Sequence, residues 1–212
     1  VTVDHVLMRG VSAPNSILDY LEGKDYDLVV MGTHGRTGLA KFFAGSVTEK
    51  VTRYAKTPVV TVHKDYHREK IEKILVPIDF SEYSRIAISQ AKTMAEEFGA
   101  ALEFMHVVEQ DAHPEFYSIS FDPILKANPA LKEHIITNLK KESGMTEDEA
   151  KFVVREGKSH QKIMDYAGAN DIDLIVMPTC GNSDLEDILM GSTTERVVRL
   201  APCPVLTVRK KE

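Results

Sequence analysis

The residues Met31 to Ser46, MGTHGRTGLAKFFAGS, contain the strongest signal in this sequence. They follow the apolar run Leu28 to Met31, and a helical pattern begins at Ser46. Glycines allow a backbone to approach a ligand closely, and the start of a helix offers unpaired N–H groups and a positive dipole end to an anion. The stretch therefore predicts a strand, a glycine-rich turn and a helix N-terminus suited to phosphate, with the candidate residues Gly32, Gly35, Arg36, Gly45 and Ser46.

The same pattern occurs a second time in the chain. His5 to Tyr66 align without a gap on Lys151 to Glu212, and about two dozen positions are identical. The second pattern includes Gly181, Gly191 and Ser192, with Pro178 in the place of Gly32. A repeat of this length indicates two copies of one structural unit. We refer to residues 1–66 as copy one and to residues 71–212 as copy two.

Alternating strands and helices are predicted in both copies. Copy two shows five apolar strand patterns, at 75–78, 102–108, 152–155, 174–177 and 205–208, each separated from the next by a helical pattern. This order is typical of an α/β fold with a doubly wound parallel five-stranded sheet. Copy one shows only the last three strands, at 5–8, 27–31 and 59–62. The sequence thus favours a longer tandem protein from which about 75 residues are missing.

Two predicted strands of copy one carry further expectations. His5 to Met8 reads as a short buried strand. Asp27 to Met31 is apolar at nearly every position, which predicts a parallel strand covered on both faces. Residues 110–129 contain three prolines and read as a loop that ends at Asn128-Pro129, a typical helix start.

Composition excludes several classes of protein. The formal net charge is −6 and no basic block is present, which argues against nucleic-acid binding. No apolar run approaches the roughly 20 residues of a membrane helix, and no signal peptide is visible, so we expect a cytoplasmic protein without a membrane partner. Cys180 and Cys203 lack metal-ligand spacing and are expected to be reduced.

The chain resembles the universal stress protein family. The resemblance is carried by Val76-Pro77-Ile78-Asp79-Phe80-Ser81, by His106-Val107 and by both G-x2-G-x9-G-S patterns, the second with its continuation Thr193. It covers essentially the whole chain and implies a Rossmann-like five-stranded domain at 71–212 and a partial domain at 1–66. It also implies dimers, or pseudo-dimers in tandem proteins, joined through the last strand. Many members of the family bind ATP.

Carried over to this sequence, the resemblance nominates an adenine-nucleotide site. Asp79 would contact the adenosine portion and the Val107 backbone would bind the adenine. The residues of the glycine-rich pattern would hold the phosphates. The motif Val76 to Ser81 adds Pro77 and Ser81 as further candidates. The complete copy-two set is Pro77, Asp79, Ser81, Val107, Gly181, Gly191, Ser192 and Thr193. Asp184, Glu186 and Asp187 would repel a triphosphate unless a divalent cation intervenes. We therefore expect ATP, AMP or ADP, with Mg²⁺ accompanying the nucleotide.

Alternatives remain open on the sequence alone. The glycines and Ser46 could serve only a turn and a helix cap, Asp79 could contribute only to helix capping, and His106 is expected to be a packed core residue. A P-loop, a dinucleotide fingerprint and a nucleophile elbow are all absent from the sequence, and no catalytic or metal-binding residue is nominated. The favoured function is a nucleotide-binding regulator of stress responses. A scaffold of the same fold and a slow ATPase are the alternatives.

Overall fold

The computed structural model describes residues 2–33, 45–64, 66–109, 124–181 and 190–210. Copy one contributes two helices and two strands, in the order α1 (Ala13–Leu21), β1 (Val29–Gly32), α2 (Ser46–Tyr54) and β2 (Val59–Val62). Copy two begins with β3 (Lys73–Pro77), α3 (Glu82–Phe98), β4 (Ala101–Val108), α4 (Ile124–Ala127) and α5 (Pro129–Ser143). It continues with β5 (Ala150–Glu156), α6 (Ser159–Ala169), β6 (Leu174–Pro178), α7 (Ser192–Leu200) and β7 (Val205–Val208).

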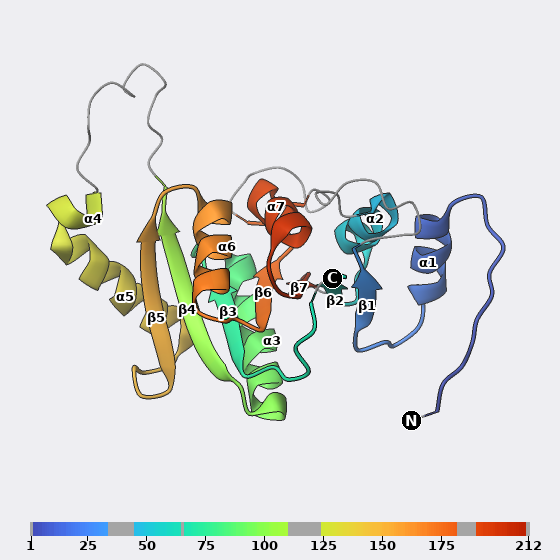
Figure 1. The fold of residues 1–212 in the computed structure, drawn as a ribbon, viewed down its shortest axis with the longest axis horizontal. Helices are drawn as coiled ribbons and strands as arrows, with labels where there is room; N and C mark the ends of the chain where they lie inside the picture. Colours follow the sequence, from blue (N-terminus) through green and yellow to red (C-terminus); the bar gives the residue numbers. More distant parts are fainter. Residues whose placement is uncertain (1, 34–44, 65, 110–123, 182–189, 211–212) are drawn as a thin grey trace, which may run out of the picture.

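The strands form a single seven-stranded sheet in the order β1-β2-β7-β6-β3-β4-β5 (Figure 1). The five strands of copy two are parallel to one another, which confirms the predicted α/β class. β1 and β2 are also parallel, whereas β2 and β7 pair antiparallel, with Val60 opposite Leu206. The last strands of the two copies therefore join within one chain.

Helices cover both faces of the copy-two sheet. One face packs against α3 and α5, in a buried cluster that includes Ala87, Ala91 and Leu139. The other face packs against α6 and α7, through residues such as Ile163 and Val197. These near-continuous apolar strands are buried on both sides, as expected for a parallel sheet.

Local sequence signals explain where the helices begin and end. The Ser81 hydroxyl accepts a hydrogen bond from the Ser84 amide at 3.3 Å and caps α3. Gly99 ends that helix with φ 66°, a left-handed conformation in which glycine carries no side-chain penalty. The Asn128 side chain caps α5 at the Leu131 amide, and Pro129 occupies the first helical turn as predicted.

Two predictions for copy one are wrong. Residues 5–8 form no strand and lie exposed, with Leu7 at 95% of its full accessibility. Their copy-two counterpart β5 pairs along its length with β4, and no described strand takes the place of β4 in copy one. Among the described residues, β1 is covered on one face only, because its residues alternate between half-buried and exposed. Its half-buried residues Val29 and Met31 pack against α1 and α2.

Candidate functional site

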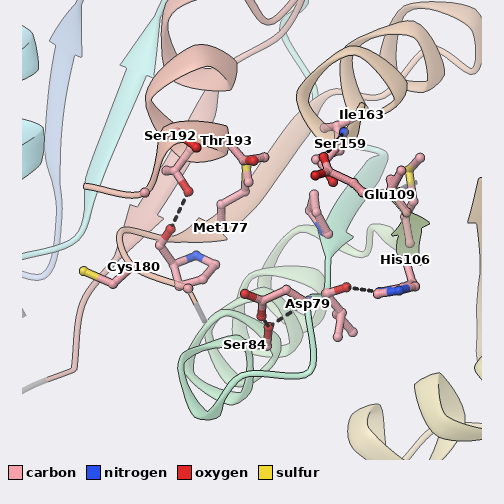
Figure 2. Close-up of a pocket in the computed structure, with 18 residues that line it drawn as sticks. Asp79, Ser84, His106, Glu109, Ser159, Ile163, Met177, Cys180, Ser192 and Thr193 are labelled. Carbon is pink, nitrogen blue, oxygen red and sulfur yellow. Dashed lines mark hydrogen bonds between the residues drawn. The ribbon is translucent and has the colours of Figure 1, made fainter. Parts of the chain in front are cut away.

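A cavity of about 350 Å³ opens at the carboxyl ends of β3, β4 and β6 (Figure 2). The chain runs from β3 through β4 to β5 on one side, and then crosses to β6 on the other side of β3. In open α/β sheets, this change of direction leaves a crevice outside the strand ends, where ligands bind. The first turns of α6 and α7 complete the cavity wall with Ser159, Ser192 and Thr193.

Asp79 reaches the cavity from a sharp turn between β3 and α3. Phe80 has φ 62°, an uncommon conformation for a residue with a large side chain. In this turn one Asp79 carboxylate oxygen, Oδ1, accepts a hydrogen bond from the Ser84 hydroxyl at 2.7 Å (Figure 2). The same oxygen accepts a hydrogen bond from the Ser81 amide at 3.0 Å. Asp79 therefore belongs to the network that begins α3 and also lines the cavity.

The second Asp79 oxygen, Oδ2, lies against the backbone of Gly181. A Cβ atom at position 181 would stand 2.5 Å from this oxygen, closer than real Cβ atoms approach. The space that a side chain would need at Gly181 is thus already taken by the carboxylate. This contact joins the end of β3 to the residues that follow β6, although the two positions are about one hundred residues apart in the sequence.

The start of α7 faces the same cavity. Gly191 precedes the helix and has no side chain that could cap its first turn, whose N–H groups have no partner within a helix. The Gly191 amide donates to the Thr179 carbonyl at 2.8 Å, and the Thr194 hydroxyl donates to the Pro178 carbonyl at 3.0 Å. These two bonds tie the helix start to the residues at the end of β6, beside the cavity that Ser192 and Thr193 line.

His106 and Glu109 form the β4 side of the cavity. His106 is half-buried, its Nδ1 donates to the Ile78 carbonyl at 2.7 Å, and its ring centroid lies 4.7 Å from that of Phe80. It is therefore packed, as expected, and also faces the cavity (Figure 2). Glu109 accepts the Ser159 amide at 2.5 Å, and hydrogen bonds from the Ser159 side chain and amide lower the pKa of its carboxyl group.

The described cavity wall is acidic. It carries the carboxyl groups of Asp79 and Glu109 and contains neither lysine nor arginine. Any anion bound here would rely on helix amides rather than on basic side chains, and a cation accompanying the ligand would reduce repulsion by the two carboxylates.

Copy one reproduces the helix-start geometry of copy two. The Gly45 amide donates to the Thr33 carbonyl at 2.7 Å, and the Thr48 hydroxyl donates to the Gly32 carbonyl at 2.8 Å. Ser46 begins α2 as Ser192 begins α7. The predicted residues Gly35 and Arg36 lie outside the described part of the chain. Within the described residues, no strand end next to β1 supplies a counterpart of Asp79.

The cavity brings together most of the residues nominated in copy two. Those that line it are Pro77, Asp79, Val107, Gly181, Gly191, Ser192 and Thr193. Ser81 is buried as the helix cap and lies behind the wall. Sequence reasoning missed several lining residues, namely Ile78, Ser84, Met105, Glu109, Ser159, Ile163, Met177 and Thr194. The carboxyl ends of the predicted strands could have indicated Met105 and Met177, whereas Glu109 and Ser159 meet only through the tertiary fold.

Neither cysteine is in a disulfide. Cys180 lines the cavity, and Cys203 is buried, which raises the pKa of its thiol to about 12. In the described ranges, no group of three or more histidine, cysteine or acidic residues is placed to hold a metal ion. No helix in the described part is long and apolar enough to span a bilayer.

Comparisons with known proteins agree with this architecture. The model of the universal stress protein family matches residues 1–63 and 70–209. A universal stress protein of Methanocaldococcus jannaschii is 36% identical over 143 residues, which cover 66% of this chain and 82% of that protein. One from Mycolicibacterium smegmatis is 26% identical over 213 residues, covering 96% of this chain and 68% of the relative.

Solved structures show the same likeness. The universal stress protein UspA of Lactobacillus plantarum has a TM-score of 0.54 and 29% identity, covering 67% of this chain and 100% of its own. A universal stress protein of Archaeoglobus fulgidus has a TM-score of 0.65 and 26% identity, and covers 93% of this chain and 67% of its own. Family model, relatives and fold agree: the chain belongs to the universal stress protein family.

Proposed function

We propose that this chain binds an adenine nucleotide in the copy-two cavity and acts as a regulator in stress responses. The observation that carries the proposal is the meeting of Asp79, Val107 and the start of α7 at one cavity. These residues come from distant parts of the sequence, and each was nominated for a different portion of the same ligand. A scaffold would have no need for this convergence.

Each part of the cavity suits one part of the nucleotide. The backbone of Val107, near the end of β4, would hydrogen-bond the adenine, and Asp79 would contact the adenosine portion. Gly191, Ser192 and Thr193 would surround the phosphates, with the Ser192 and Thr193 amides as donors, because a helix N-terminus favours anions and the Gly191 amide already donates to the Thr179 carbonyl. Mg²⁺ bound with the nucleotide would reduce repulsion by Asp79 and Glu109.

The space and the backbone fit such a ligand. The cavity volume of about 350 Å³ lies within the range of roughly 300–1,000 Å³ common for small-molecule sites. Gly191 lines the cavity and carries no side chain, which would let a phosphate approach the backbone at the start of α7. We assign the site to copy two because the described residues of copy one offer no equivalent of Asp79 or Val107.

The proposed regulatory path runs through the junction of the two copies. α7 begins at the cavity and leads to β7, which pairs with β2. Glu195 in the first turn of α7 also lies 3.7 Å from Arg53 of α2. Binding at the α7 start would be reported to copy one through these contacts. We propose that residues 1–66 and 71–212 act as the two halves of an intramolecular pseudo-dimer in the cytoplasm.

Calorimetric titration with ATP, ADP and AMP, each with and without Mg²⁺, tests the proposal. Saturable binding that Gly191→Val weakens at least tenfold is the expected result. Gly45→Val is the matched control, because Gly45 has nearly the same backbone conformation before α2. Equal losses of nucleotide affinity in Gly191→Val and Gly45→Val would show that the copy-two cavity alone is not the binding site. No binding of any nucleotide to the wild-type chain would favour an interaction protein of the same fold.

A further inference from the structure

Two basic side chains meet between α6 and α7, beside the copy-two cavity. Ser159 in the first turn of α6 and Ser192 in the first turn of α7 both line the cavity (Figure 2). His160 directly follows Ser159, and Arg196 lies on the same face of α7 as Ser192, because residues four apart are neighbours on a helix surface. The Arg196 guanidinium lies 3.4 Å from Nδ1 of His160. We refer to His160 and Arg196 as the basic pair.

The charges of the basic pair act on the cavity wall. Glu109 lines the cavity, and hydrogen bonds from Ser159 are the main cause of the lowered pKa of its carboxyl group. The positive charges of His160 and Arg196 lower this pKa further. Exposed charges separated by much more than about 10 Å are largely screened at ordinary salt. The basic pair therefore lies close enough to act on a charged ligand at this side of the cavity.

The basic pair contains an electrostatic conflict that an anion would relieve. Partial burial lowers the pKa of His160, and repulsion by Arg196 lowers it further. Of the other charged groups that act on the ring, Glu109 beyond β4 raises the pKa and Lys158 before α6 lowers it. Arg196 can only donate, so its contact needs a neutral His160 ring with Nδ1 as acceptor. An anion between the two side chains would pair with both and favour the protonated ring.

The cavity wall and the basic pair suit different parts of a polyphosphate. A phosphate at the first turn of α7 meets helix amides, and the described wall contributes neither lysine nor arginine. A nucleoside monophosphate carries no phosphate beyond that point. A longer tail carries more negative charge past the carboxylates of Asp79 and Glu109, so it gains from positive groups placed outside the wall.

We propose that the basic pair forms a subsite for the terminal phosphate of a nucleoside di- or triphosphate, which lets the chain distinguish these ligands from a nucleoside monophosphate. The subsite rests on the proposed function, because it needs a nucleotide whose first phosphate lies at the start of α7. Arg196 supplies the permanent charge. His160 supplies a second charge that forms when the tail is bound.

Calorimetric titration of the full chain with ATP and with AMP, both in the presence of Mg²⁺, tests the subsite. Arg196→Gln should weaken ATP binding about three- to fivefold, the scale of an exposed ion pair, and should change AMP binding less than about twofold. Lys50→Gln is the matched control, because Lys50 is the counterpart of Arg196 in α2 and both residues are exposed. This control removes the same charge and should leave both affinities within about twofold.

A second measurement follows His160 itself. The affinity for ATP should rise as pH falls through the pKa of His160, because protonation supplies the second charge, and His160→Gln should remove this rise. The ligand has the same protonation in both titrations, so the difference between the two profiles isolates His160. Imidazole resonances followed by NMR between about pH 5.5 and 8, assigned with the same variant, should show that saturating ATP raises the pKa of His160 by about 0.5 or more. AMP should leave it unchanged.

Several results would overturn the subsite. Equal losses of ATP and AMP affinity in Arg196→Gln would show that the residue acts on the first phosphate or on α7 as a whole. An ATP affinity that Arg196→Gln leaves unchanged, or a pKa of His160 that ATP does not raise, would contradict it directly. In these three cases AMP still binds and the proposed function stands. Failure of the wild-type chain to bind any nucleotide would overturn both proposals.

Discussion

Replacing Asp173 by alanine should lower the free energy of unfolding much more than the matched replacement in copy one, Asp27→Ala. The Asp173 carboxylate is nearly inaccessible and accepts the Glu72 and Lys73 amides, and the Arg68 guanidinium donates to it at 2.9 Å. The variant removes all three interactions at the start of β3. Asp27→Ala is the matched change in copy one, where the same residue type is exposed before β1.

The expected loss follows from the surroundings of each group. Net hydrogen bonds to a charged group contribute about 1.5–3 kcal/mol, but Arg68 is half-exposed and its ion pair contributes little. Water can also reach part of the freed backbone, so we expect Asp173→Ala to lower the free energy of unfolding by about 2–3 kcal/mol. Asp27→Ala should change it by less than about 0.5 kcal/mol, as surface substitutions do.

Urea unfolding followed by circular dichroism measures both variants against the wild-type chain. At roughly 2–4 °C per kcal/mol for a protein of this size, the melting temperature of Asp173→Ala should fall by about 5–10 °C. Equal losses in the two variants would refute the reasoning, because the argument depends on what the two carboxylates contact. A loss below about 0.5 kcal/mol for Asp173→Ala would refute it equally, since that is the scale of an ordinary surface change.

Three further predictions concern the cavity and the core. Gly181→Ala should weaken nucleotide binding about tenfold or more, because the new Cβ displaces the Asp79 carboxylate. A tenfold loss corresponds to about 1.4 kcal/mol of binding free energy, which calorimetric titration measures. Glu109→Gln should destabilise the chain at neutral pH. Hydrogen bonds from Ser159 lower the pKa of Glu109 in the folded chain. The Glu109 carboxylate therefore stabilises the fold above the ordinary carboxyl pKa, and this stabilisation is lost as pH falls through the folded pKa. The melting temperatures of variant and wild type should accordingly converge in acid. Cys203, with a pKa of about 12, should resist thiol reagents at pH 8 until urea unfolds the chain.

Much of the fold could be predicted because its signals are local. Gly99, Asn128 and Pro129 mark helix ends through backbone preferences that depend on few neighbours, and all three occupy the expected positions. The repeat added a second check, because α6 and α7 begin at positions predicted from both copies. Boundaries of the other predicted elements that form differ by one or two residues, which is the ordinary uncertainty at element ends, whereas the short helix α4 lies within the stretch predicted as a loop.

The errors concern residues whose state depends on partners. His5 to Met8 have the apolar character of a strand, but a strand needs a neighbour for its backbone groups. The sequence of β1 is as apolar as that of β6, yet in the part of the chain that the structure describes only β6 has a helix on its second face. Apolar pattern predicts which surface can be buried, and the neighbouring elements determine whether it is.

The candidate site was predictable where a motif marks it. Asp79, Gly191 and Ser192 stand in recognisable patterns and line one cavity. Glu109 and Ser159 belong to no motif, because their contact joins a strand end to a helix start fifty residues away. Such pairs arise from the packing of α6 beside β4, which the sequence alone did not reveal.

The junction between β2 and β7 has a consequence for assembly. The buried Thr61 hydroxyl of β2 donates to the Val205 carbonyl of β7, and the buried Thr207 hydroxyl of β7 donates to the Val59 carbonyl of β2. Each of these strands is enclosed by two neighbours, so neither has a backbone row left for another molecule. Because the two strands belong to one polypeptide, their stoichiometry is set covalently. The contact should therefore survive dilution that would dissociate a dimer of separate chains.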